Sequence, residues 1–192
     1  MIAIIKYNAG NIKSVQNALF RLGVESIVTD DEKAIRNADK IIFPGVGEAG
    51  SAMFYLQERG MDTLLKSLTQ PFLGICLGLQ LMCKHSEEGN TNCLNIFEVE
   101  VRKFPPTEIV PHMGWNTIYD LEGEIFKNNA GNEDVYFVHS YYADLCESTS
   151  ATCNYILPFS AALHKDNFYA TQFHPEKSAD VGEKILKSFI EL

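Results

Sequence analysis

The sequence predicts an α/β protein with a mostly parallel central sheet, helices on both of its faces and additional antiparallel strands in its second half. In the first half, short β-rich runs alternate with helical patterns, as in βαβ units. In the second half, alternating runs separated by polar turns are typical of antiparallel or mixed strands. No repeat, low-complexity tract or linker divides the 192 residues, so we expect a single domain over residues 1–192.

The first half supplies the expected parallel strands and the helices between them. Apolar runs predict strands at residues 2–7, 24–30 and 39–45, the last of which runs into a turn at Pro44 and Gly45. Apolar residues at helical spacing predict helices over residues 12–22, which Gly23 ends, and over residues 48–69, with an interruption at Gly60.

After Pro71, the apolar run FLGI predicts a buried strand that turns at Cys76 into a helix over residues 77–89. Alternating runs then predict strands near residues 97–104, 116–119, 135–143 and 160–173. A closing amphipathic helix carries Val181, Ile185 and Phe189 on one face.

Composition excludes several classes of function. The formal net charge is −9 and no cluster of Lys and Arg occurs, which argues against nucleic acid or an anionic membrane as the main partner. The N-terminus lacks the features of a signal peptide and no run is long enough to span a membrane, so we expect a cytoplasmic protein. The five cysteines form no C-x-x-C pair, so neither a disulfide framework nor a zinc site is expected, and no cofactor is indicated.

Cys76 lies between Gly74 and Gly78 at the predicted corner between strand and helix. Gly-x-nucleophile-x-Gly at such a corner is a nucleophile elbow, in which the glycines permit a sharp turn that projects the central side chain above the sheet. The N-terminus of the following helix favours a thiolate there. The alternative is a buried structural cysteine between two packing glycines.

His174 and Glu176 are the candidate partners of this cysteine. A nucleophilic thiolate needs a base, and the imidazole needs a third group that fixes its tautomer. Pro175 biases His174 towards extended geometry, in which residues i and i+2 face the same side. We therefore expect Glu176 to accept from one ring nitrogen while the other faces Cys76; the alternative is a simple turn at the end of a strand.

Two segments are candidates for stabilising an oxyanion. The backbone N–H of Leu77 follows the nucleophile at the start of its helix. Gly45 and Gly47 let the chain present N–H groups around Val46, although an ordinary turn between strand and helix has the same composition.

The stretches FPGVG, LGICLGLQLM and TQFHPEKS, in this order, resemble the class I (triad) glutamine amidotransferases. The stretches YNAGNIKSVQNAL, VPHMGWN and VYFVHSYYA are similar to the glutaminase subunit of imidazole glycerol phosphate synthase, and the resemblance covers essentially the whole chain. It implies a three-layer, flavodoxin-like fold. It also implies hydrolysis of L-glutamine through a glutamyl thioester, with Cys76 as nucleophile, His174 as general acid and base, and Glu176 as its orienting group.

The resemblance also implies residues that bind glutamine and residues that face a partner. The residues implied for glutamine binding are Gln80, Glu88 (for the α-ammonium), His139, Ser140 and Tyr141. Those implied for the partner surface are Pro111, His112, Met113, Gly114, Trp115, Asn116 and Lys177. The implied partner is a (β/α)8-barrel cyclase that uses the ammonia to make imidazole glycerol phosphate and aminoimidazole carboxamide ribotide. The family implies weak activity without it, because the segment from Gly45 to Gly47 needs reorganising.

Some features leave the partner open. Lys6, Asn8 and Phe43 depart from the usual family pattern, but none belongs to the triad. A paralogous subunit that supplies ammonia to a sugar-modifying synthase would keep every catalytic residue. Three further possibilities are a γ-glutamyl peptidase, a catalytically silent subunit, and a redox or chaperone protein of the same broad fold; the last would not need Gln80, Glu88 and Glu176 together.

Overall fold

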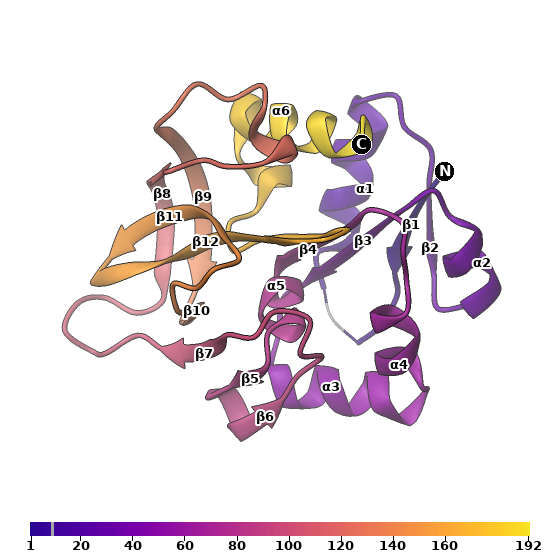
Figure 1. The fold of residues 1–192 in the computed structure, drawn as a ribbon, viewed down its shortest axis with the longest axis horizontal. Helices are drawn as coiled ribbons and strands as arrows, with labels where there is room; N and C mark the ends of the chain where they lie inside the picture. Colours follow the sequence, from indigo (N-terminus) through magenta and orange to yellow (C-terminus); the bar gives the residue numbers. More distant parts are fainter. Residues whose placement is uncertain (9) are drawn as a thin grey trace.

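The computed structural model describes residues 1–8 and 10–192 and confirms the predicted α/β class. A mixed sheet forms its centre, and helices pack on both of its faces (Figure 1). Among the described residues, the sheet has thirteen strands, of which ten follow the order β2-β1-β3-β4-β13-β12-β10-β7-β5-β6.

The parallel half of the sheet comes mainly from the first 76 residues. Its strands are β1 (Ile2–Ile5), β2 (Ser26–Thr29), β3 (Lys40–Gly45), β4 (Phe72–Cys76) and, from the end of the chain, β13 (Phe168–Thr171). The helices are α1 (Ile12–Arg21), α2 (Glu32–Asn37), α3 (Ala49–Glu58), α4 (Met61–Lys66), α5 (Leu77–Met82) and α6 (Ala179–Ile190). The break between α3 and α4 falls at Gly60, as the sequence predicts.

Two apolar cores cover the two faces of this half. Because side chains alternate along a strand, Ala3 and Ile5 of β1 join the core beneath α2, α3, α4 and α5, whereas Ile2 and Ile4 join the core beneath α1 and α6. Figure 1 shows α1 and α6 above the sheet and α3 and α4 below it. The helices packed on both faces fix the positions of the strand ends.

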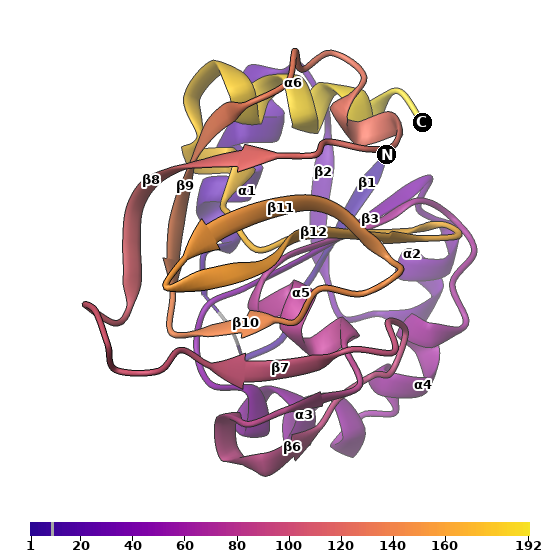
Figure 2. The same ribbon diagram turned by 60° about the vertical axis from the view of Figure 1, so that its left-hand side comes forward.

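The second half is built mostly from antiparallel pairs. Its strands are β5 (His85–Ser86), β6 (Thr91–Asn92), β7 (Glu100–Lys103), β8 (His112–Tyr119), β9 (Glu133–His139), β10 (Tyr141–Ala143), β11 (Thr149–Tyr155) and β12 (Leu157–Lys165). Short 3₁₀ helices lie at Glu88–Asn90, Glu124–Phe126 and Pro175–Lys177. In both ribbon views, β8 and β9 stand side by side at the edge of the molecule away from α2 (Figure 1, Figure 2).

Several predicted boundaries were wrong. The helix expected over residues 77–89 ends at Met82, because Cys83 is extended and Lys84 N–H instead donates to Val99 O at 3.0 Å, which draws the chain into the sheet. The expected strand at 135–143 is two strands broken at Ser140, and 160–173 belongs to a hairpin of β12 and β13. Neither α2 nor β11 was expected. None of the helices in the described part of the chain is long and apolar enough to cross a membrane.

Candidate active site

The candidate site lies where the carboxyl ends of three parallel strands meet. β4 lies between β3 and β13, and its last residue, Cys76, pairs in register with Gly45 at the end of β3. His174 follows β13 by three residues. In open α/β sheets, ligands bind beyond the carboxyl ends of the strands, so this edge is the expected location of a site.

Cys76 adopts the strained geometry of a nucleophile elbow. Its backbone has φ 55° and ψ −107°, directly between β4 and α5. The flanking glycines are required by close packing, because a Cβ on Gly78 would lie 1.9 Å from Phe43 O and one on Gly74 would lie 2.5 Å from Met82 Sδ. The turn therefore holds the Cys76 side chain at the end of the sheet.

His174 and Glu176 form a buried pair behind this cysteine. His174 Nδ1 lies 2.8 Å from Glu176 Oε1, and neither side chain is exposed to solvent. His174 is extended, but Glu176 reaches it from a 3₁₀ turn that Pro175 begins, so the two residues meet without the continuous extended segment that the sequence predicts.

The electrostatics of this pair favour a cationic imidazole. Burial opposes protonation of the ring, but the neighbouring Cys76 and the hydrogen-bonded Glu176 outweigh it and raise the pKa of His174 to about 10. The carboxylate hydrogen-bonds Nδ1, so Nε2 is the ring nitrogen available to Cys76. This arrangement can accept and return a proton at the sulfur.

The segment expected to bind an oxyanion borders the same place. A Cβ on Gly45 would lie 2.1 Å from the hydroxyl oxygen of Tyr7, and Gly47 has φ 133°, so both positions require glycine. Gly10 N–H donates to Val46 O at 3.4 Å. Leu77 begins α5, where the first N–H groups have no partner within the helix.

A cavity of about 300 Å³ joins most of the predicted residues. Its lining consists of Val46, Gly47, Cys76, Leu77, Gln80, Glu88, Pro111, Val138, His139, Ser140 and Tyr141. The structure thus brings together around one cavity the expected nucleophile, all five residues expected to bind glutamine and three of the four expected to form the oxyanion hole. A small polar molecule that enters it meets the sulfur directly.

Glu88 stands at the rim of this cavity. Its carboxylate accepts from Ala49 N–H at 2.8 Å, and its own N–H donates to Ser86 Oγ at 3.2 Å. Burial raises the pKa of Glu88, the Ala49 N–H opposes that shift and the charge of Glu48 adds to it. A carboxylate half buried beside another acid is suited to a cation that arrives with a ligand.

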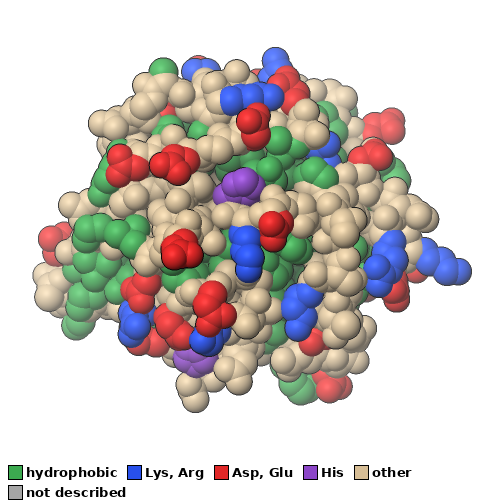
Figure 3. Space-filling view, viewed as in Figure 1, with side chains coloured by type: hydrophobic (Ala, Val, Ile, Leu, Met, Phe, Trp, Pro, Cys, Tyr) green, Lys and Arg blue, Asp and Glu red, His purple; other side chains and the backbone are tan. Residues whose placement is uncertain are grey.

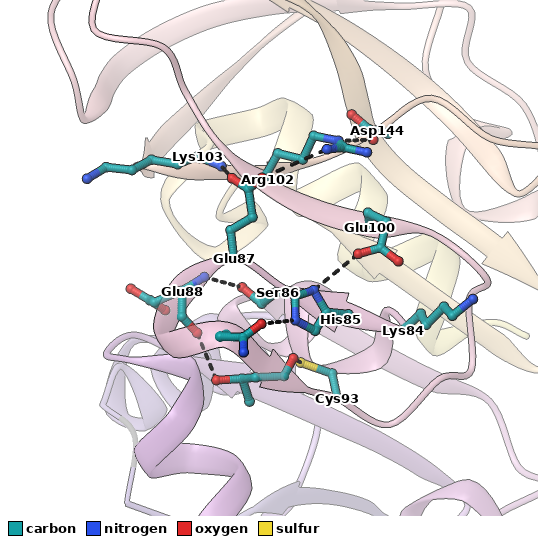
Figure 4. A network of polar contacts seen from close by, with 12 residues as sticks. Lys84, His85, Ser86, Glu87, Glu88, Cys93, Glu100, Arg102, Lys103 and Asp144 are labelled. Atoms are coloured by element: carbon teal, nitrogen blue, oxygen red, sulfur yellow. Dashed lines mark hydrogen bonds and ion pairs between the residues drawn. The ribbon is translucent and has the colours of Figure 1, made fainter.

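Glu87, the neighbouring acid, faces elsewhere. Its carboxylate accepts from Lys103 N–H at 2.7 Å and lies 3.8 Å from Arg102 Nη1. Figure 4 shows Glu87 directed towards Arg102 and the backbone of Lys103, and Glu88 on the other side of the chain. Two adjacent acids therefore have separate surroundings, and only Glu88 lines the cavity.

The segment from Pro111 to Asn116 forms the start of β8 and has two different faces. Met113 and Trp115 are 63% and 56% exposed, whereas His112 is buried and its ring points inward to His139. The expectation that His112 faces a partner is therefore wrong for its side chain, because alternation along the strand turns it into the core. Lys177 is exposed and directly follows Glu176, and its contact with a partner stays a prediction.

Apolar surface continues beside this segment. Ile109, in the connection from β7 to β8, is 81% exposed. Figure 3 shows hydrophobic side chains gathered at the left of the molecule, where Figure 1 places that connection, while acidic and basic side chains are intermixed elsewhere on this face. An exposed apolar patch of this kind is typical of a protein–protein contact.

Sequence reasoning missed two polar residues in contact with the candidate catalytic residues Cys76, His174 and Glu176. Asn11, in the left-handed conformation before α1, donates from Nδ2 to Glu176 Oε1 and lies 3.3 Å from His174 Nδ1. Gln172 is fully buried and places Nε2 3.7 Å from Cys76 Sγ. Neither belongs to a pattern that periodicity reveals. The one signal in the sequence was the polar amide of Gln172, which interrupts an apolar stretch two residues before His174. In the described residues, no group of three or more His, Cys, Asp or Glu side chains is arranged to hold a metal ion.

Comparison with known proteins shows the family of this chain. The family model for class-I glutamine amidotransferases matches residues 3–192. The chain is 61% identical to imidazole glycerol phosphate synthase subunit HisH of Bacteroides fragilis, over 100% of this chain and 99% of that protein. It is 44% identical to the HisH subunit of Pasteurella multocida, over 99% and 97% of the two chains.

Solved structures show the same fold at much lower identity. A glutamine amidotransferase superposes with a TM-score of 0.77 at 19% identity, over 100% of this chain and 98% of that one. A putative GMP synthase protein from Thermoplasma acidophilum has a TM-score of 0.75 at 20% identity, over 100% and 92% of the two chains. These two likenesses establish the three-layer architecture alone.

Proposed function

Because this chain belongs to the class-I glutamine amidotransferase family, we propose that it is the glutaminase subunit of an imidazole glycerol phosphate synthase in histidine biosynthesis. It hydrolyses L-glutamine to glutamate and passes the ammonia to a cyclase subunit. The observation that carries the proposal is the cavity that joins Cys76 to Glu88, with the buried His174–Glu176 pair behind the sulfur.

Glutamine binding uses both ends of the cavity. The α-ammonium lies against the Glu88 carboxylate, and the carboxamide carbon lies at Cys76 Sγ. Gln80 and the segment His139 to Tyr141 also line this cavity. An ammonium beside this half-buried carboxylate supplies its counter-charge, so binding favours a substrate with a free amino group.

The chemistry proceeds in two halves. The Cys76 thiolate attacks the carboxamide carbon, and the N–H groups around Val46 and Leu77 stabilise the resulting oxyanion. The His174 imidazolium gives its proton to the nitrogen as the C–N bond breaks, which leaves a thioester and ammonia. His174 then removes a proton from water as it attacks the thioester, which releases glutamate and regenerates the Cys76 thiolate beside a protonated His174.

The partner completes the function. We propose that a (β/α)8-barrel cyclase covers the exposed Met113 and Trp115 face of β8 and contacts Lys177. Pro111 belongs to both this segment and the lining of the cavity, so a partner seated there adjoins the exit from the site. Ammonia is largely protonated in neutral water, and direct transfer keeps it nucleophilic. We place the reaction in the cytoplasm, in line with five cysteines that are all free thiols.

The test is glutamate release by the purified chain, alone and with the barrel cyclase and its ribonucleotide ligand, with Cys76→Ser as the blank. We expect weak release alone and strong stimulation by the cyclase, both absent in Cys76→Ser. Release that this cyclase does not stimulate would retain the glutaminase and indicate another synthase, such as a sugar-modifying one. No release in either mixture would contradict the proposed chemistry.

A further inference from the structure

Gln172 is the first member of a buried hydrogen-bond chain that begins at the nucleophile. Its Nε2 lies 3.7 Å from Cys76 Sγ, and its Oε1 accepts from Gln80 Nε2 at 3.0 Å. Because the carbonyl oxygen of this amide is already an acceptor, the N–H₂ group is the end directed at the sulfur. Gln80 Nε2 also donates to Tyr141 O at 3.0 Å, so both of its hydrogens are used.

The Tyr141 carbonyl connects this amide pair to two buried histidines. His139 Nδ1 lies 2.7 Å from Tyr141 O, and a carbonyl can only accept, so Nδ1 carries the proton. In a neutral ring, Nε2 is then an acceptor, and it lies 3.0 Å from His112 Nδ1. His112 must therefore also be protonated at Nδ1.

Asn116 closes the chain at the other end. Its Nδ2 lies 3.2 Å from His112 Nε2 and donates to Asn154 O at 3.2 Å, while its Oδ1 accepts from Thr117 N–H at 2.8 Å. The orientation of this amide is thus fixed by backbone groups on both sides. Each side-chain hydrogen bond from Asn116 to Tyr141 O then has one assigned donor and one assigned acceptor, and all point the same way along the chain of contacts.

We propose that Gln172 is a further catalytic residue, which donates an N–H to the Cys76 thiolate, and that His112, His139 and Asn116 are positioning residues that hold this donor through Tyr141 O and Gln80. This inference deepens the proposed function and rests on Cys76 being its nucleophile. It adds a role for the inward face of β8, whose outward face carries Met113 and Trp115.

The surroundings of the sulfur show why this donor matters. Val138 O lies 3.8 Å from Cys76 Sγ, where it accepts from a thiol but repels a thiolate. The amide N–H of Gln172 has the opposite preference, since it stabilises the anion. Burial, moreover, lowers the pKa values of both histidines, to about 4 for His112 and about 3 for His139, which keeps them neutral at working pH.

The tautomers can be measured directly in the full-length chain. Long-range ¹H–¹⁵N NMR correlations distinguish the two nitrogens of each ring. We expect both His112 and His139 to be neutral and protonated at Nδ1 from pH 6 to pH 8. An Nε2–H tautomer of either ring, or titration of either ring within that range, would overturn the chain.

The role of Gln172 is tested by alkylation of Cys76 with iodoacetamide, with the modified peptide quantified by mass spectrometry. Gln172→Met keeps the length of the side chain and removes the donor. We expect its alkylation rate at neutral pH to fall roughly 10–100-fold, the range for a hydrogen bond to a charged group, and the profile to move to higher pH. A profile that coincides with wild type would refute the donor role.

A distant change tests the positioning residues and serves where Gln172→Met does not fold. Asn116→Asp replaces the donor beside His112 Nε2 with a carboxylate, which draws a proton to that nitrogen and disrupts donation to His139. We expect an Nε2–H signal from His112 and alkylation of Cys76 slowed about 3–10-fold, as for the loss of one neutral hydrogen bond.

The matched control is Asn154→Asp, which adds the same charge on an exposed side chain of the neighbouring strand. Equal rates in the two variants would exclude the positioning role. Neither readout needs glutamine or a partner, so failure here is distinct from failure of the proposed function.

Discussion

Three buried histidines of this molecule lie in two environments that shift their pKa values in opposite directions. His174, behind Cys76, has its pKa raised to about 10, whereas the pKa values of His112 and His139 are lowered to about 4 and about 3. All three rings are 5% exposed or less, so burial alone does not distinguish them. The difference is the neighbouring charge: His174 has Glu176 and Cys76, while His112 and His139 have each other and a set of aromatic rings.

This contrast distinguishes a histidine that can transfer a proton from histidines that hold neighbouring groups in place. Desolvation penalises the charged form of any imidazole, and only an adjacent anion reverses the sign. His174 can therefore hold a proton and release it to a reacting atom. His112 stacks on Tyr155 at 4.0 Å between ring centroids and stays neutral, which suits a fixed donor in a polar chain.

The largest expected effect comes from removing the anion that makes His174 different. In Glu176→Gln we expect kcat to fall about 10²–10⁴-fold, because the ring loses its orienting group and its counter-charge. The carboxylate raises the pKa of His174, so the alkaline limb of the pH–rate profile should move to lower pH. Asp180→Asn, an exposed acid at the start of α6, is the control. A profile with an unmoved alkaline limb would contradict the assignment.

Glu88 extends the comparison to a half-buried carboxyl group that, among the described residues, has no cation beside it. We expect Glu88→Gln to raise KM for glutamine roughly 10–100-fold, with a smaller change in kcat, because a charge-assisted contact to the α-ammonium is lost. Glu87→Gln is the matched control, since that acid faces Arg102. Steady-state glutaminase kinetics of the complex with the cyclase distinguish the two variants, and equal KM values would contradict the role of Glu88.

β8 carries both the buried His112 and the exposed Trp115, so its outward face tests the partner independently of the inward one. We expect Trp115→Ala to weaken binding of the cyclase by about 30-fold, the effect of losing a contact worth about 2 kcal/mol at the centre of an interface. Titration calorimetry measures the Kd. Phe54→Ala removes an aromatic ring that is 65% exposed on α3 and should bind within twofold of wild type. Similar Kd values for both variants would remove β8 from the interface.

The sequence predicted the parallel half of the fold better than the antiparallel half, and the reason is physical. The elbow around Cys76 and the break at Gly60 depend on neighbouring residues, which a local pattern records. The end of α5 depends on a bond from Lys84 to Val99, which joins segments that the chain brings together only on folding. Similarly, β11 pairs with β8 and β12 through contacts that no local period encodes.

The same division holds within the candidate site. Cys76, His174 and Glu176 lie in short motifs whose chemistry can be read residue by residue. Gln172 contacts Cys76 across 96 positions of the sequence and Asn11 contacts His174 across 163, so these contacts follow only from the assembled sheet. The inward direction of His112 depended on where β8 begins, which sequence analysis placed four residues too late.

The smallest expected effect concerns stability, and it distinguishes a neutral histidine pair from a charged one. Unfolded histidines bind protons near pH 6.5, whereas folded His112 and His139 do so only near pH 4 and pH 3. Between about pH 6.5 and pH 4 the unfolded state therefore binds more protons, and the free energy of unfolding falls as the pH falls. The limiting slope is about 1.4 kcal/mol per pH unit for each histidine.

His112→Phe removes one of the two groups, so denaturant titrations should show a shallower pH dependence of the free energy of unfolding over this range. Phe159→Leu disturbs the same aromatic cluster without removing a titrating group, and it should lower the whole curve while keeping the wild-type slope. If His112→Phe keeps that slope as well, His112 is protonated in the folded state, and the contrast with His174 is lost.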